Sequence, residues 1–209
     1  MRPPRSSDET TLIRRLQAAL SAPRRAALAQ SKTRVKNWFT QEAPVIHWSE
    51  MRSPLGPLFV ATSARGLCAV DFGRNENDFI ARLDPRARLV KETHELLQVT
   101  LQLKEYFAGQ RTQFDLPLDL SALTPFQKQV LETACRIAPG QVWSYLQVAR
   151  KMGRPKSSRP VGQALAHNPV PIVIPCHRVI AADGSLGGYS GGAGLSAKRW
   201  LLRLEGARL

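Results

Sequence analysis

The sequence has little cysteine, no long apolar run and few acidic residues, and each shortage excludes a class of protein. Its three cysteines, Cys68, Cys135 and Cys176, are an odd number at wide spacing. This argues against a disulfide framework and favours a reducing, cytoplasmic setting. No segment approaches the ~20 apolar residues of a transmembrane helix. No apolar run follows the basic start of the chain, so we expect neither a membrane protein nor a secretory signal.

Metal binding is also disfavoured. No two cysteines have the short spacing of paired metal ligands. A zinc site made by Cys68 with His47 and His94 would lack the close ligand pairs on which structural zinc sites rely. We therefore expect no metal.

The shortage of acidic residues makes the chain strongly basic. The sequence contains 30 lysines and arginines but only 16 acidic residues, which gives a net charge of +14 and a pI near 10.7. This favours a polyanionic partner, usually nucleic acid, over a merely solvated surface or a membrane-facing patch. Residues 133–182 contain no Asp or Glu. The stretch carries seven cations: Arg136, Arg150, Lys151, Arg154, Lys156, Arg159 and Arg178.

The pattern along the chain predicts three regions. Residues 1–43 read as a basic helical N-terminal extension, with a helical apolar pattern over 10–31; a loosely attached appendage and a DNA-contacting arm are the two interpretations. Residues 44–118 read as a small α/β domain in which no chemistry is expected. Residues 119–209 read as a mostly helical domain, reached through a linker at 116–123. The strands expected in the α/β domain are 45–51, 58–62 and 67–72, and its helices are 77–83 and 93–108.

The last region has the outline of a helix-turn-helix. A helix begins at Thr124-Pro125 and runs to about residue 137, because Thr is a good N-cap and Pro suits the first helical position. Residues 142–143 are expected to be extended, and helices are expected at 145–152, 159–167 and 197–204. The 159–167 helix is built of small residues such as Gly162 and Ala164. Close approach to a minor groove and close packing in the core explain this composition equally well.

The run Pro175-Cys176-His177-Arg178-Val179 carries the strongest chemical signal. It follows the apolar residues 172–174, which predict a short buried strand ending at the thiol. Cysteine is a nucleophile only as the thiolate, which nearby cations or a base favour. Most lone cysteines are core fillers, but an adjacent imidazole and guanidinium favour a nucleophile here.

These features together resemble a known family. The segment from Arg159 to Arg178 and the loop 188–192 (Gly-Tyr-Ser-Gly-Gly) are similar to the O6-alkylguanine-DNA alkyltransferases, also called methylated-DNA–protein-cysteine methyltransferases. The resemblance covers residues 124–206, and the stretch 168–179 (Asn-Pro-Val-Pro-Ile-Val-Ile-Pro-Cys-His-Arg-Val) is its most specific part. It implies a ribonuclease-H-like α/β N-terminal domain and a mostly α C-terminal domain with a helix-turn-helix. Residues 1–43 lie outside the pattern.

The resemblance implies a catalytic group of four residues. Cys176 would be the nucleophile that takes the alkyl group, and His177 its general base through a water. Glu205 would orient the imidazole, as in a triad. Asn168 would be the hinge that joins the recognition helix to the active-site segment.

The resemblance also implies contacts to DNA and to a flipped base. Arg159 would fill the vacated stack, Tyr145 would help rotate the nucleotide, and Gly162 and Ala164 would lie along the minor groove. Substrate contacts are expected from Tyr145, Val179, Tyr189 and Ser190. The sequence departs from the family pattern in two places: Pro160 stands where the family commonly has Ala, and Ala166-His167 stand where relatives often carry a basic side chain.

The implied function is stoichiometric transfer of an alkyl group from O6-alkylguanine, and also from O4-alkylthymine, in double-stranded DNA to Cys176. No cofactor is expected, and the protein is expected to be a monomer, with cooperative binding along DNA left open. Its location would be cytoplasmic with the nucleoid, or nuclear in a eukaryote. Three alternatives stand beside this function: a lesion-binding module without transfer, a Cys-His hydrolase and a transcription regulator.

Overall fold

The computed structural model describes residues 30–31, 43–72, 75–192 and 194–207. Residues 1–43 and 44–209 are separate compact units. The helix expected at 10–31 lies outside the described residues, except for its last two positions, which are helical. Among the described residues no helix is long and apolar enough to cross a membrane.

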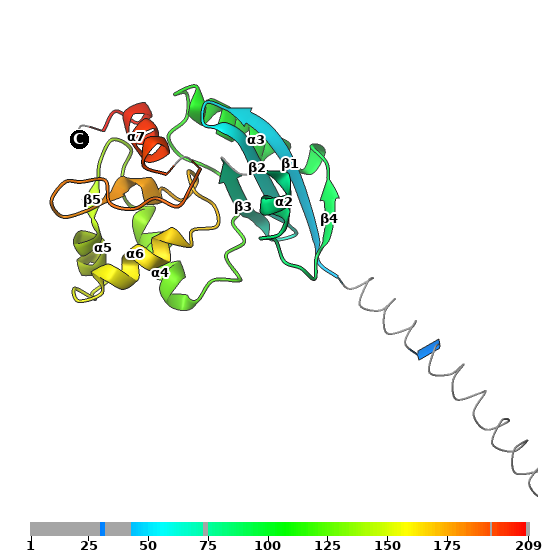
Figure 1. The fold of residues 1–209 in the computed structure, drawn as a ribbon, viewed down its shortest axis with the longest axis horizontal. Coiled ribbons are helices and arrows are strands. Elements are labelled where there is room, and N and C mark those ends of the chain that lie inside the picture. Colours follow the sequence, from blue (N-terminus) through cyan, green and yellow to red (C-terminus); the bar gives the residue numbers. More distant parts are fainter. Residues whose placement is uncertain (1–29, 32–42, 73–74, 193, 208–209) are drawn as a thin grey trace, which may run out of the picture. The chain divides into compact units, whose positions relative to one another are not determined.

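The first half of the larger unit is built on a four-stranded sheet of order β3-β2-β1-β4 (Figure 1). Strands β1 (Val45–Ser53), β2 (Gly56–Ser63) and β3 (Gly66–Phe72) form an antiparallel meander, as their alternating patterns predicted. β4 (Arg88–Lys91) pairs in parallel with β1. The sequence prediction missed β4 because a four-residue strand with a cation at each end carries little apolar signal.

Both faces of the sheet are covered. Helix α2 (Glu76–Ile80) contributes Phe79 to a small core with Phe59 and Trp48. The short η1 helix (His94–Leu96) and α3 (Leu97–Phe107) pack on the other face, against Leu58 and Val60. The inner strand β2 is therefore apolar on both sides and buried at its four central residues, as strands covered on both faces are.

The buried face of α3 differs from the one expected. The pattern over 93–108 predicts a broad apolar face made of Leu96, Leu97, Thr100, Leu101, Leu103 and Phe107. Leu96, Thr100 and Leu103 are buried as predicted, but Leu97 and Leu101 are 57% and 46% exposed. The helix also buries Val99 and Tyr106, which were not predicted. The sequence contains apolar residues on more than one side of this helix, so periodicity alone did not select the side that meets the sheet.

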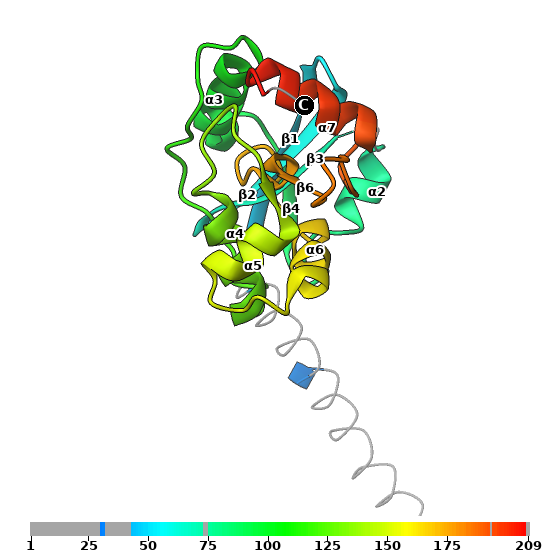
Figure 2. The ribbon, with the colours of Figure 1, turned by 90° about the vertical axis from the view of Figure 1, so that its left-hand side faces the viewer.

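The second half is helical. Its elements are α4 (Pro125–Ala134), β5 (Trp143–Ser144), α5 (Tyr145–Lys151), α6 (Ser158–Ala166), η2 (Cys176–Arg178), β6 (Val179–Ile180) and α7 (Leu195–Leu204). Thr124 and Ser144 each close a reciprocal capping box with the glutamine three residues on, which explains where α4 and α5 begin. Figures 1 and 2 both place η2 and its following loop between α7 and the group α4–α6.

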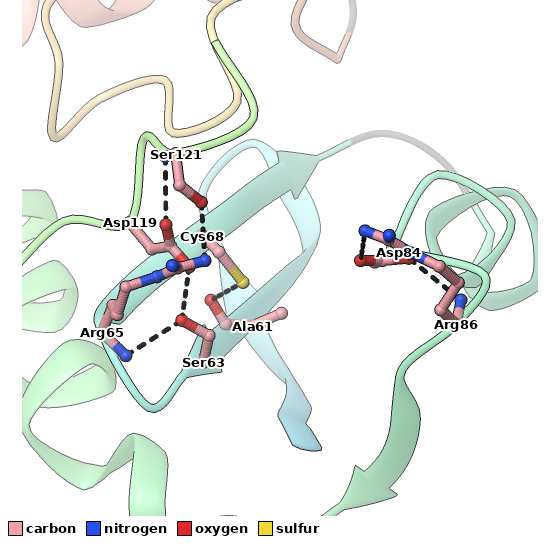
Figure 3. Close-up of polar contacts among 8 residues, drawn as sticks. All are labelled: Ala61, Ser63, Arg65, Cys68, Asp84, Arg86, Asp119 and Ser121. Atoms are coloured by element: carbon pink, nitrogen blue, oxygen red, sulfur yellow. Dashed lines mark hydrogen bonds and ion pairs between the residues drawn. The ribbon is translucent and has the colours of Figure 1, made fainter. Parts of the chain in front are cut away.

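The expected linker at 116–123 is fastened to the sheet. Leu67 N–H donates to the Pro117 carbonyl at 2.8 Å, and Asp119 N–H donates to the Leu67 carbonyl at 2.9 Å. The Asp119 carboxylate also accepts from Ser63 at 2.6 Å and lies 3.2 Å from the Arg65 guanidinium (Figure 3). Burial alone would raise the pKa of Asp119, but its hydrogen bonds, chiefly from Ser121 and Ser63, hold it at about 2.

One hydrophobic core joins the two halves. Leu58, Val60 and Phe72 from the sheet belong to the same cluster as Val130 and Leu165 from the helices. The two halves of residues 44–207 therefore stabilise each other by burying shared apolar surface.

Gly66 tests how tightly the linker is fastened. Gly56 and Gly66 both have positive φ, +97° and +125°, but only at Gly66 would a Cβ collide with the Pro117 backbone. We expect Gly66→Ala to lower the unfolding free energy by about 1–3 kcal/mol more than Gly56→Ala. The backbone strain is similar in the two variants, but only Gly66→Ala also overpacks the linker. Urea unfolding of both variants measures the difference. Equal losses would contradict a rigid linker.

Candidate active site

The thiol of Cys176 begins a 3-10 turn and does not end a strand. The expected strand at 172–174 is wrong: Pro171 and Ile174 form an isolated bridge, and the apolar run makes a buried turn. Cys176 is the first residue of η2. An apolar run of three residues signals burial without distinguishing a strand from a buried turn.

Asn168 fixes this turn from inside. Its amide donates to the Ile174 carbonyl at 2.9 Å, and its side-chain oxygen accepts from Val170 N–H at 3.1 Å. The side chain is buried and connects the end of α6 to the residues just before Cys176. This is the bridging position expected of the hinge.

The turn is strained at Ile172. Its φ is +77°, the only positive φ among the described residues other than glycine. A β-branched residue in this region costs on the order of 1–3 kcal/mol. The Ile172 side chain is fully packed in the core. Its apolar contacts and the Asn168 hydrogen bonds together stabilise the positive φ, which is unfavourable for an isolated isoleucine.

The environment of Cys176 keeps the resting thiol neutral. The residue is only 6% exposed. Burial raises the pKa of Cys176, although a hydrogen bond with Asn168 and the charge of Lys198 act in the opposite direction. The sequence argument expected nearby cations to favour the thiolate, but desolvation dominates. A base must therefore remove the proton when the thiol reacts.

His177 is placed as such a base. Its Nε2 lies 2.9 Å from Oε1 of Glu205. Burial lowers the pKa of His177, so the ring is neutral, and a carboxylate can only accept, so Nε2 carries the hydrogen. Nδ1 is then the basic nitrogen, and it is buried without a protein partner.

The Glu205 carboxylate collects donors from distant parts of the chain. Arg178 donates from Nε to Oε2 at 2.8 Å and from Nη2 to Oε1 at 2.9 Å, and its Nη1 donates to the Ile137 carbonyl. Tyr106 Oη donates to Oε1 at 2.8 Å. Burial would raise the pKa of Glu205, but hydrogen bonds from His177 and Arg178 hold it at about 2, so it is ionised.

Tyr106 corrects one expectation. We expected no chemistry in residues 44–118, yet this residue from α3 reaches the carboxylate beside His177. No motif marks it, because the two partners are 99 positions apart in the sequence.

Lys198 is the second residue that the sequence analysis missed. It is fully buried on α7, and Nζ donates to the carbonyls of Val179 and Leu186 at 2.5 and 2.6 Å. Burial lowers its pKa to about 8, with the Cys176 charge acting in the opposite direction. A signal did exist: Lys198 precedes Leu201 and Leu202 by three and four residues, which places a cation on the apolar stripe of that helix.

A cavity of about 260 Å³ opens above the thiol. It is lined by Tyr145, Gly162, Leu165, Ala166, Cys176, Gly188, Tyr189 and Ser190. The hydroxyl of Tyr189 is buried and has no hydrogen-bond partner in the protein. Three expected substrate contacts, Tyr145, Tyr189 and Ser190, thus share the cavity with Cys176. Val179 does not line it: its side chain is buried and its carbonyl accepts from Lys198.

The sheet supports the loop that carries Tyr189. The Phe72 ring at the end of β3 lies 6.2 Å from the Tyr189 ring, centre to centre. A Cβ on Gly191 or Gly192 would collide with the Phe72 ring. The loop therefore needs glycine at both positions to close over this phenylalanine.

An open groove leads from the surface into the cavity. Tyr145, Gly162, Ala166 and Gly188 line both, and Arg159, which is exposed, lies on the groove at the first turn of α6. Ala164 is 4% exposed and packs in the core, which favours the packing interpretation for this residue.

The cations of the α5–α6 region face solvent. Six of the seven found in the acid-free stretch are exposed, and five of these six lie in this region. Within the described part of the chain none of the five forms an ion pair with a carboxylate. The five are Arg150, Lys151, Arg154, Lys156 and Arg159. Their charge is available to an external anion.

Comparison with known proteins identifies the family. Residues 125–207 match the DNA binding domain of 6-O-methylguanine DNA methyltransferase, and residues 46–120 match its ribonuclease-like domain. The chain belongs to the 6-O-methylguanine DNA methyltransferase family.

Individual relatives agree with this assignment. A methylated-DNA–protein-cysteine methyltransferase of Shigella flexneri is 40% identical over 164 residues, covering 75% of this chain and 94% of that one. One from Methanosarcina barkeri is 36% identical, covering 77% and 97%. The crystal structure of Mycobacterium tuberculosis OGT in complex with DNA superposes with a TM-score of 0.66 at 38% identity, covering 77% of this chain and 92% of that one. Residues 1–45 of this family member precede both matched domains.

The buried charge of Glu205 makes a stability prediction for this family member. Glu205→Gln leaves the Arg178 guanidinium buried without its counter-charge, so we expect a loss of about 3–5 kcal/mol in unfolding free energy. Glu105 is the matched control, because it pairs with Arg111 at 2.6 Å while both side chains remain about 30% exposed. We expect Glu105→Gln to cost less than about 1 kcal/mol. Urea unfolding at neutral pH measures both, and similar losses would argue against the buried cluster as a stabilising centre.

Proposed function

We propose that this protein repairs alkylated DNA directly, by transferring the alkyl group from O6 of guanine to its own Cys176. The observation that carries the proposal is the continuous path from the exposed Arg159 through the groove to the cavity over the thiol. Family membership supports the reaction class, and the unpaired cations of the α5–α6 region support a DNA partner.

The residues around the thiol suit a single displacement. His177 Nδ1 takes the thiol proton through an intervening water, and the sulfur attacks the alkyl carbon. The S–C bond forms as the C–O6 bond breaks, and the thiol proton ends on the restored guanine. Glu205 stabilises the imidazolium that forms between these events. The thioether is stable, so one molecule repairs one lesion.

Access to the thiol supports base flipping. Cys176 lies beneath a cavity of about 260 Å³, near the lower limit of about 300 Å³ for small-molecule pockets, which suits one base and not a duplex. α5 and α6 would bind DNA as a helix-turn-helix, with Gly162 allowing close approach along the minor groove. Arg159 would stack in the space that the base leaves.

The cavity walls favour a planar, hydrogen-bonding base. Tyr145 and Tyr189 provide aromatic surface in the cavity. Ser190 provides a hydroxyl at its edge. O4-alkylthymine presents the same alkoxy group on a smaller ring, so we propose it as a second substrate. The monomeric state and the location in the cell stay predictions.

Transfer to Cys176 is tested by intact mass. Incubation with a stoichiometric amount of duplex carrying O6-methylguanine should add one methyl group to the protein, because the displacement leaves the carbon on sulfur. Peptide mapping should place the methyl group on Cys176. The exposed Cys135 gives the matched control: Cys135→Ser should still be methylated and Cys176→Ser should not. An unchanged mass of the unaltered protein would refute the proposed reaction, and the same assay with O4-methylthymine tests the second substrate.

The stacking role of Arg159 is tested by separating flipping from chemistry. Arg159→Ala should slow transfer from duplex DNA by about tenfold or more, since one base-stacking contact is worth about 1–3 kcal/mol. Transfer from the free base O6-benzylguanine should stay unchanged, because that substrate needs no flipping. Arg136, also exposed, is the control: Arg136→Ala should leave both rates nearly unaltered. Equal slowing of both substrates by Arg159→Ala would contradict the stacking role.

A further inference from the structure

The hydroxyl of Tyr106 is the only side-chain donor that the first half of the described chain supplies to the Glu205 carboxylate. The residue is 1% exposed, and its Oη donates to Glu205 Oε1 at 2.8 Å. A carboxylate that is ionised can only accept, so the direction of this bond is fixed.

The ring of Tyr106 is held firmly. Its centre lies 5.7 Å from the Phe107 ring and 5.4 Å from the Phe114 ring. Backbone bonds of α3 and burial against the shared core restrict it further. The hydroxyl is therefore presented to the carboxylate from a rigid support, which is what orients a reacting group.

Glu205 itself needs such support. It is the C-cap of α7, and Gly206 follows with a φ of +75°, so the regular helix has ended where the side chain leaves the backbone. Three donors converge on its Oε1: Tyr106 Oη, His177 Nε2 and Arg178 Nη2. The position of this one oxygen decides the orientation of the imidazole.

We infer that Tyr106 is a positioning residue for alkyl transfer: its hydroxyl holds Oε1 of Glu205 against His177 and limits how strongly that carboxylate attracts the imidazole proton. The inference deepens the proposed function and rests on it. It gives the ribonuclease-like half of the chain a part in the proposed reaction, through a residue that is neither the proposed nucleophile nor the proposed base.

The electrostatic direction follows from the hydrogen bonds. Donation by Tyr106 spreads the negative charge of Glu205, so removing the hydroxyl concentrates that charge on the bond to His177 and favours the imidazolium. The other groups stay in place: the charges of Arg178 in η2 and Lys198 on α7 act on the His177 ring. Tyr189 in the loop lies near Cys176, Tyr106 and Glu205. Loss of the hydroxyl should therefore raise the pKa of His177.

Tyr106→Phe tests the inference because it removes one oxygen and keeps the ring. The rate of alkyl transfer should fall at low pH as His177 becomes protonated. In Tyr106→Phe the midpoint of this acid limb should shift to higher pH by about half a unit. The plateau rate should fall by no more than about tenfold, the value of one lost hydrogen bond. NMR titration of the His177 ring in the free full-length protein should show the same upward shift.

Phe114→Leu is the matched control. It loosens the packing around the Tyr106 ring and leaves the hydroxyl in place, so we expect reduced stability with no shift in the pH profile or in the ring titration. A shift equal to that of Tyr106→Phe would assign the effect to packing and overturn the inference. An unmoved or lowered acid limb in Tyr106→Phe would overturn it as well.

The two proposals fail separately. If the unaltered protein transfers no alkyl group, the proposed function is refuted, while the NMR titration still decides whether Tyr106 sets the protonation of His177.

Discussion

The bond network around the Glu205 carboxylate is the interaction on which the rest of the site depends. It fixes the tautomer of His177 and neutralises the buried Arg178. Through that guanidinium it also connects to the Ile137 carbonyl in the turn that follows α4. A buried carboxylate is costly unless its lone pairs are filled by well-placed donors. Here donors from α3 and η2 meet a helix end, so the charge is stable only when the whole unit is folded.

This network also bears on how the neutral thiol of Cys176 would react in the proposed transfer. Burial keeps Cys176 protonated at rest, which protects it from the side reactions of an exposed thiolate. In the proposed reaction the neutral, oriented His177 would supply the base that forms the thiolate. The buried Lys198 adds a positive charge that favours the thiolate once the proton leaves. The strained Ile172 and the buried lysine cost stability on their own, and the shared core offsets this cost.

Local signals in the sequence predicted the elements well and the long-range contacts poorly. The alternating strands 45–51, 58–62 and 67–72, and the helix starts at Thr124 and Ser144, have short-range causes that a pattern contains. The Pro175–Val179 motif predicted a nucleophile and a base on adjacent residues, and that assignment stays a prediction. The short edge strand β4, the turn at Ile172 and the buried side of α3 depend on packing partners elsewhere. Tyr106 and Lys198 were missed for the same reason, since each acts on atoms far away in the sequence.

The shared core makes the ribonuclease-like half a working part of the site. Phe72 closes against the two glycines that follow Ser190, and Tyr106 reaches the carboxylate that orients the base. Val70 N–H donates to the Pro169 carbonyl at 2.8 Å, so β3 also holds the turn that Asn168 spans. These three contacts reach the loop of Tyr189, the carboxylate beside His177 and the turn that precedes Cys176. A change in the packing of the sheet must therefore displace each of them, because close-packed interiors transmit strain. The ribonuclease-like half thus sets the geometry around Cys176, on which the proposed reaction depends.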